Sequence, residues 1–186
     1  VPDDVVEEAL DAIDRARTKV GGYAYSSANR NLNEMGEGDL RFMDLAPGSA
    51  ARAAVCETTM MLAGRGDEER HRKALELFFK SWESLAVRKS QRGTHIKPYG
   101  IAPYYFMFGH LYCAQAIEQI KDKQVREGFR AQMRQVLAQS IDKKGTWNDR
   151  QFGRSAGYGT AMALMTMHMN RLPKPNSWQA GAVGLK

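Results

Sequence analysis

The sequence predicts an all-α protein, an arc of three helical hairpins in which outer amphipathic helices alternate with inner apolar helices. Three observations predict it: segments with one apolar stripe, segments that are apolar almost all round, and their regular alternation along the chain. Gly48, Gly100 and Gly153 mark the entries to the apolar segments and lie 52 and 53 residues apart. A fixed period of this size is typical of a repeat. No convincing alternating strand pattern occurs.

The outer helices are predicted from segments in which apolar residues recur at spacings of three and four. They run over about Asp4–Val20, Glu68–Arg88 and Gln124–Asp142. Each has one apolar stripe and a charged remainder, as expected of a helix with a single wet face. Asp3 is placed to cap the first of them.

The inner helices are predicted over Ser49–Ala63, Ile101–Ile117 and Ser155–Met169. These segments are rich in Ala, Gly, Met and Thr and have almost no polar face, so we expect each to be enclosed on every side. Small residues allow such helices to approach one another closely. Their methionines are expected to fill the core.

The hairpins therefore cover about 4–64, 67–120 and 124–171 and form one repeat domain of residues 1–172. Residues 173–186 contain Pro173, Pro175 and Gly181 and are expected to be an irregular tail, which Trp178 docks onto the body.

The composition is that of a globular protein, with 43% hydrophobic and 26% charged residues, which argues against intrinsic disorder. The formal charge is +6, with Lys and Arg spread over outer helices and connections. This favours a solvated basic surface, the alternative being an anionic partner such as nucleic acid, an anionic membrane surface or an acidic polysaccharide.

No transmembrane segment is expected. The longest uncharged stretch, between Pro98 and Ile117, contains Pro103 and His110, so it predicts a buried helix of a soluble protein. The chain begins at Val1 rather than Met, which favours an exported or periplasmic protein over a cytoplasmic one.

The two cysteines, Cys56 and Cys113, form no CxxC pair, so a structural zinc site is excluded on ligand number. Both lie among apolar helical residues. Buried free thiols are favoured over a single disulfide.

The stretch GTWNDRQFGRSAGYGTAMALMTM at 145–167 resembles the prenyltransferase and squalene-cyclase repeat, in which a G-x-W turn leads to an inner helix. The GGYAYSS segment with the later SAARAAVCETTMMLAGRGD, and PYGIAPYYFMFGHLYCAQAIEQI, are similar to further copies. The resemblance covers about residues 4–171 and implies an α/α-toroid like that of terpene cyclases. The six helices expected here would make half of a full ring.

The family's catalytic and metal motifs do not match this sequence. The D-x-D-D acid of squalene-hopene cyclases is absent, as are the Asp-x-Cys arrangement of the zinc-binding prenyltransferases and the Cys-Gly-Glu-Gln of thioester domains. Cys56-Glu57-Thr58 departs from the last of these. No catalytic residue, metal site or cofactor is therefore expected from the resemblance.

Candidate ligand-binding residues lie where the three connections and the starts of the inner helices would converge, at the mouth of the arc. They are Tyr23, Tyr25, Tyr104, Tyr105, Trp147, Asp149, Arg150 and Tyr158. An aromatic-lined cleft with a few polar groups suits a ligand, and aromatic rings stabilise cations. The structural alternative is a glycine–aromatic pair that packs on the neighbouring hairpin at each turn. For Asp149 and Arg150 the default is a surface ion pair, against contact with an anionic sugar or a metal.

His110 completes the candidate ligand-binding set. It lies mid-helix among apolar residues, either as a general base or as a core histidine that donates to a carbonyl. His168, near the end of its helix, is placed to interact with the helix dipole. Glu57, the one acid inside the first inner helix, either faces a cavity or pairs with an arginine such as Arg52.

The leading hypothesis is a non-catalytic binding or scaffold module of a larger assembly. A protein partner or a homo-oligomer would cover the open edges of the arc, and an anionic ligand is a further candidate. The competing hypothesis is part of a terpenoid-cyclase-like or polysaccharide-lyase-like enzyme, completed by missing sequence or by another subunit.

Overall fold

The computed structural model describes residues 1–26, 32, 34–89, 91, 93–149 and 153–180. Within these residues the chain is helical, and the only β pairing is an isolated bridge between Arg17 and Tyr23. The predicted all-α class is confirmed. The α-helices are α1 (Asp3–Ala16), α2 (Ala46–Leu62), α3 (Glu68–Lys80), α4 (Trp82–Arg88), α5 (Tyr105–Ile117), α6 (Lys123–Ser140) and α7 (Ala156–Met167). Three short 3-10 helices, η1 (Glu37–Asp39), η2 (Gly153–Ser155) and η3 (Met169–Arg171), lie in the connections.

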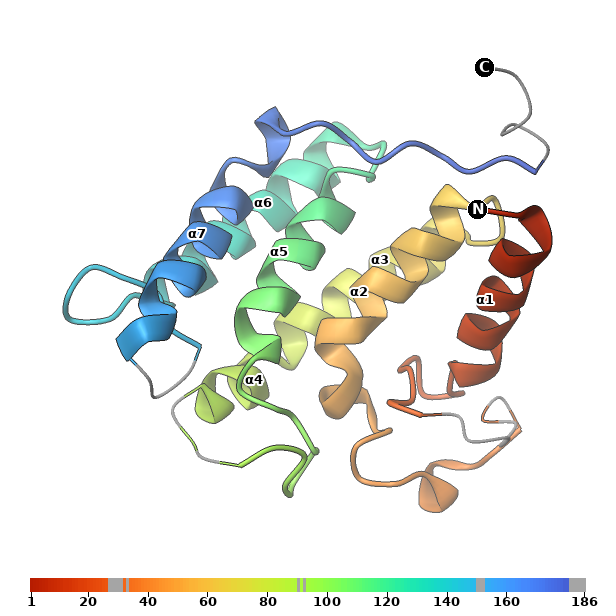
Figure 1. Cartoon of the computed structure of the whole chain (residues 1–186), viewed down its shortest axis with the longest axis horizontal. Coiled ribbons are helices and arrows are strands. Elements are labelled where there is room, and N and C mark those ends of the chain that lie inside the picture. Colours follow the sequence, from red (N-terminus) through yellow and green to blue (C-terminus); the bar gives the residue numbers. More distant parts are fainter. Residues whose placement is uncertain (27–31, 33, 90, 92, 150–152, 181–186) are drawn as a thin grey trace.

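The helices form two layers. Helices α2, α5 and α7 lie side by side, with α5 in the centre, while α3 and α6 pack behind them (Figure 1). Helix α1 lies beside α2, at the opposite edge from α7. The predicted inner helices α2, α5 and α7 therefore form one layer and the predicted outer helices α3 and α6 form the other, whereas α1 lies at the edge of the inner layer. Whether this layering continues into the ring of a toroid is not tested and stays a prediction.

Local chemistry sets the helix boundaries. The carboxylates of Asp67 and Asp122 accept hydrogen bonds from the backbone of Arg70 and Val125 and cap α3 and α6. The helix predicted over 68–88 is interrupted at Ser81, so it becomes α3 and α4. The first helix ends at Ala16, earlier than predicted, because the chain turns back and the backbone of Ala24 donates to the carbonyl of Ala16.

The centre of the inner layer is packed through small residues. A Cβ on Gly109 of α5 would lie 2.9 Å from the Cβ of Ala51 on α2 and 3.1 Å from the ring of Phe78. This distance is below normal van der Waals contact, so the approach of α5 to α2 requires glycine at this position. The surrounding core contains the fully buried side chains of Leu75 and Phe106.

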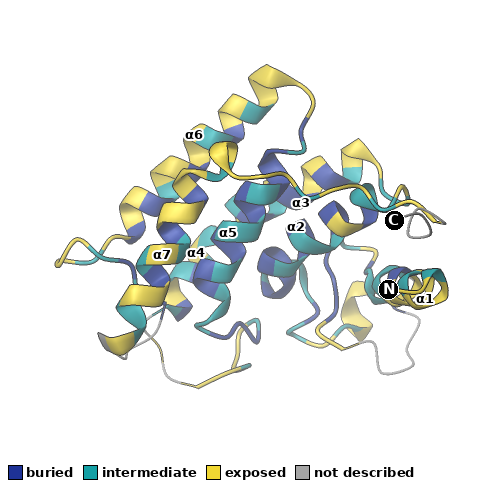
Figure 2. Ribbon diagram, turned by 45° about the horizontal axis from the view of Figure 1, so that its top comes forward, coloured by how far each residue is buried: buried dark blue, intermediate teal, exposed yellow. Residues whose placement is uncertain are grey.

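Helix α7 differs from the prediction that it is enclosed on every side. Tyr158, Leu164 and Met165 are 51%, 47% and 44% exposed, and Figure 2 shows exposed residues along this helix. Only Gly159, Ala163 and Thr166 of α7 are buried. The helix lies at the edge of the inner layer, where α5 and α6 cover one side and no described element covers the other.

After η3 the chain crosses over the ends of α5 and α2 without helix or strand through residue 179 (Figure 1). The backbone N–H of Trp178 donates to the carbonyl of Leu62 at 2.9 Å, and Lys174 Nζ donates to the carbonyl of Glu118 at 2.8 Å. The expected contact of Trp178 with the body is confirmed. No described helix has the length and apolar character needed to cross a membrane.

Candidate functional site: a tyrosine surface beside a buried ion-pair network

A continuous series of aromatic rings runs from two connections onto α5. We call it the tyrosine surface; its members are Tyr25, His95, Tyr104, Tyr105, Phe108 and Tyr112. The ring centroids of Tyr25 lie 4.6 Å from His95 and 6.4 Å from Tyr105. Along α5, Tyr105 lies 4.8 Å from Tyr104 and 6.1 Å from Phe108, which lies 4.7 Å from Tyr112.

Helix periodicity and one loop position these rings. Tyr105, Phe108 and Tyr112 follow one another at spacings of three and four and therefore share one face of α5. His95 has a φ of 52° and its Nδ1 lies 2.9 Å from the carbonyl oxygen of Gly100. Gly100 has a φ of 65°, and a Cβ there would lie 2.6 Å from Met43, so the loop requires glycine.

Arg52 of α2 lies beneath the tyrosine surface. Its guanidinium carbon is 5.6 Å from the ring centroid of Tyr25 and 6.0 Å from that of Tyr105, both within the range of cation–π attraction. Its terminal nitrogens donate to the carbonyls of Gly48, Tyr23 and Met43 at 3.0, 2.8 and 3.2 Å. Arg52 thus holds two loops and two rings in place.

Arg52 forms no salt bridge with a described carboxylate, although the carboxylate of Asp44 is close enough to oppose the lowering of its pKa by burial. Asp44, which is buried nearby, pairs instead with Arg41, whose Nε lies 2.8 Å from its Oδ2. Burial lowers the pKa of Arg52, and it raises the pKa of Tyr105. The neutral tyrosine and the cation beneath it therefore give this surface a positive potential.

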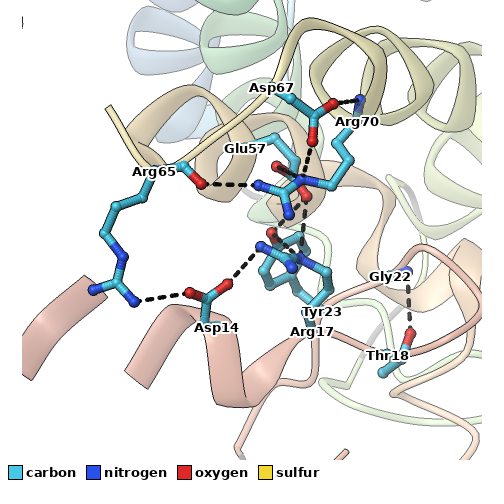
Figure 3. A network of polar contacts seen from close by, with 9 residues as sticks. All are labelled: Asp14, Arg17, Thr18, Gly22, Tyr23, Glu57, Arg65, Asp67 and Arg70. Atoms are coloured by element: carbon cyan, nitrogen blue, oxygen red, sulfur yellow. Dashed lines mark hydrogen bonds and ion pairs between the residues drawn. The ribbon is translucent and has the colours of Figure 1, made fainter. Parts of the chain in front are cut away.

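Tyr23 belongs to a separate, buried network (Figure 3). Its hydroxyl donates to Glu57 Oε1 at 2.7 Å and accepts from Arg17 Nε at 3.1 Å. Glu57 Oε1 and Oε2 lie 3.4 Å from Arg17 Nε and 3.5 Å from Arg70 Nε. Glu57 therefore pairs with arginine, as one predicted alternative had it, but with Arg17 and Arg70 rather than Arg52. Burial raises the pKa of Tyr23.

The network continues onto α1 through Arg65, which follows α2. Its guanidinium lies 3.2, 2.7 and 2.9 Å from carboxylate oxygens of Glu7, Asp11 and Asp14. These three acids lie on the side of α1 that faces Arg65, and Asp14 also pairs with Arg17 at 2.6 Å. Because Leu10 is the one fully buried residue of α1, ion pairs carry much of its attachment.

His110 is a fully buried core residue. Its Nδ1 lies 2.7 Å from the carbonyl of Phe106, and its Nε2 accepts from the indole Nε1 of Trp82 at 2.9 Å. Nδ1 donates to the carbonyl, and Nε2 carries no proton because it accepts from the indole, so the imidazole is neutral; burial lowers its pKa to about 4. Of the two predicted roles for His110, the structure therefore shows the core histidine that donates to a carbonyl.

The other candidate residues do not join the tyrosine surface. Trp147 is buried and donates from Nε1 to the carbonyl of Leu137 at 2.9 Å. Asp149 is 1% exposed, so it does not lie on the surface as expected, and its pairing with Arg150 stays a prediction. Arg150 lies outside the described residues. Tyr158 lies on α7, and the ring contacts of the described part of the chain do not connect it to the others.

The described cavities lie away from the tyrosine surface. Three cavities of about 360, 370 and 290 Å³ lie elsewhere, lined respectively by residues such as Arg130, Arg88 and His71. None of these three is lined by a candidate residue of the sequence analysis. An open surface of this kind suits an extended partner better than a small molecule.

The described part of the chain contains neither a metal-binding cluster nor a deprotonated thiol. Within it, no group of three His, Cys, Asp or Glu side chains is placed to hold a metal ion. Cys56 and Cys113 are free thiols, as predicted. Burial raises the pKa of Cys56 to about 11 and that of Cys113 well above its ordinary value, so both remain protonated at neutral pH.

Comparison with known proteins found no match among family models, curated proteins or solved structures. The site therefore has to be interpreted from its own geometry.

Sequence reasoning identified Tyr25, Tyr104 and Tyr105 and the structure brings these three together. It missed His95, Phe108 and Tyr112 and the role of Arg52. The spacing of Phe108 and Tyr112 from Tyr105 could have predicted that these rings share one helix face. The placement of His95 could not be predicted, because it depends on a loop conformation.

Proposed function

We propose that this protein is a non-catalytic binding module of a larger assembly, and that its tyrosine surface contacts an acidic, apolar segment of a partner protein. The observation that carries the proposal is the connected series of partly exposed rings over the half-buried guanidinium of Arg52, which forms no salt bridge with a described carboxylate. Tyrosine supplies a large, stiff contact area with a polar end and is enriched at interfaces.

The positive charge of Arg52 favours an acidic partner. A half-buried cation whose hydrogen bonds go mainly to carbonyl oxygens is stabilised when an anion approaches. A carboxylate of a bound segment placed near Tyr25 and Tyr105 would meet this potential.

Engagement of the reactive side chains in structural contacts supports a binding role. Both ring nitrogens of His110 are hydrogen-bonded, and both cysteines are protonated thiols. The buried carboxylate of Glu57 is held by two arginines and Tyr23. None of these groups is placed to exchange a proton with a substrate.

We also propose that the two layers are an arc of the toroid repeat to which the sequence is similar. The side-by-side order of α2, α5 and α7, each preceded by a helix of the other kind, supports this interpretation. In such an arc the tyrosine surface lies at one end of the inner layer.

A selection from a random peptide library displayed on phage tests the proposal. We expect the immobilised chain to enrich peptides that combine Asp or Glu with apolar or aromatic residues. Their affinity should fall with increasing salt and fall about tenfold in Tyr25→Ala, since a well-packed interface aromatic contributes more than about 1 kcal/mol.

Tyr158→Ala is the matched control, because Tyr158 and Tyr25 are 51% and 47% exposed. Peptides without acidic residues, or equal losses in both variants, would refute the proposal. Displacement of the peptides by a heparin oligosaccharide at equal or higher affinity would identify an acidic polysaccharide as the ligand instead.

A further inference from the structure

The two edges of the inner layer differ in charge. The first 14 residues include six acids, Asp3, Asp4, Glu7, Glu8, Asp11 and Asp14, all of which lie in α1. Arg154, His168, Arg171 and Lys174 flank α7, and the nearby Glu118 and Glu127 are ion-paired with Arg130. The α1 edge is therefore acidic, and the α7 edge is basic.

The outer face of α7 is apolar. Gly157, Ala161, Leu164 and Met165 lie on the side opposite the buried Gly159, Ala163 and Thr166 and are exposed. A helix that is apolar all round is stable in water only when its second side is covered. No described part of this chain covers it.

The outer face of α1 has a complementary shape. Val5, Ala9 and Ala12 follow one another at spacings of four and three and are exposed. This narrow stripe of small side chains is flanked by the exposed acids Asp4 and Glu8. Small residues on one helix allow the larger Leu164 and Met165 of another to pack closely.

We infer that a second copy of this chain docks head to tail, with the α7 edge of one copy against the α1 edge of the next. The contact buries the Leu164 and Met165 side chains on the Ala9 stripe and places Arg171 and His168 among the α1 acids. It is heterologous, so it generates a ring if the rotation closes and a filament if it does not. It uses neither Tyr25 nor Arg52 and is independent of the proposed function.

Directed cross-linking tests the geometry. Ala9→Cys and Ala161→Cys, mixed and joined by a short bismaleimide, should give a cross-link between positions 9 and 161 by mass spectrometry. The matched control replaces Ala161→Cys by Gln132→Cys, an exposed position on α6. A cross-link no stronger than in this control overturns the inference, as does an Ala161→Cys homodimer, which would indicate α7 against α7.

Mass in solution tests the association itself. Light scattering should show species larger than one chain at low salt, with smaller species as salt increases because the flanking charges are screened. Leu164→Glu should weaken the association about tenfold or more, since it places a charge in the contact. Val87→Glu, on an equally exposed apolar residue of α4, should leave it unchanged. A single-chain mass for the wild type at every concentration, or equal effects of both variants, would refute the inference.

Discussion

Removing one hydroxyl tests whether the buried network holds α1 to the body. In Tyr23→Phe, Glu57 Oε1 loses its 2.7 Å hydrogen bond and retains the Arg17 ion pair at 3.4 Å. Glu57 Oε2 already has no hydrogen-bond partner in the described structure. A hydrogen bond to a charged group contributes about 1.5–3 kcal/mol, so we expect the free energy of unfolding to fall by about 2 kcal/mol.

The assay is urea unfolding followed by circular dichroism, with Tyr112→Phe as the matched control. Tyr112 is a half-buried tyrosine whose hydroxyl makes no hydrogen bond among the described residues, and its loss should change stability by less than about 0.5 kcal/mol. Hydrogen exchange of α1 should also become faster in Tyr23→Phe, because α1 has little apolar burial of its own.

A double-mutant cycle of Tyr23→Phe with Glu57→Gln measures the coupling energy between Tyr23 and Glu57. Glu57→Gln alone leaves Arg17 and Arg70 without their buried carboxylate. Because the two arginine side chains are 19% and 33% exposed, we expect the free energy of unfolding to fall by about 2–3 kcal/mol, below the range for fully buried pairs. In that background Tyr23→Phe should cost less than in the wild type by at least about 0.5 kcal/mol. Additive losses, or equal effects of Tyr23→Phe and Tyr112→Phe, would refute the reasoning.

Three further perturbations follow from the packing and the charges. Gly109→Ala should destabilise the protein by about 1–3 kcal/mol in urea unfolding because its Cβ would overlap Ala51, whereas Gly128→Ala, with open space around it, should stabilise α6 by about 0.5–1 kcal/mol; the same sign for both would contradict the packing. Burial lowers the pKa of His71 and His110 to about 4, so the unfolded chain binds more protons between pH 4 and the ordinary value of 6.5. The free energy of unfolding should therefore be highest above pH 6.5 and fall by up to about 3 kcal/mol for each histidine as the pH falls to 4. NMR titration midpoints near 6.5 would disprove this. Arg65→Ala removes the cation shared by three α1 carboxylates and should accelerate hydrogen exchange in α1 but not in α6; unchanged exchange in α1 would show that the ion pairs do not hold it.

Helix type and order could be predicted because they depend on local periodicity. The apolar segments became α2, α5 and α7, and the one-sided segments became α1, α3 with α4, and α6. The break at Ser81 and the early end of α1 at Ala16 were not predicted, because both depend on backbone hydrogen bonds that periodicity does not encode.

The environment of each helix was harder to predict. An all-apolar pattern predicts a covered helix for α5 and for α7 alike, although only α5 lies between two neighbours. The pairing of Glu57 with Arg17 and Arg70 depends on contacts between residues 40 and 13 positions apart in the chain, and no short-range spacing encodes it. The three tyrosines that the structure brings together were predictable because they begin or precede inner helices.

The most direct test of a binding role for the tyrosine surface is the dissociation constant of a selected acidic peptide for wild type, Tyr25→Ala and Tyr158→Ala. The structure predicts about tenfold weaker binding for Tyr25→Ala and unchanged binding for Tyr158→Ala. Equal affinity for all three chains would contradict it.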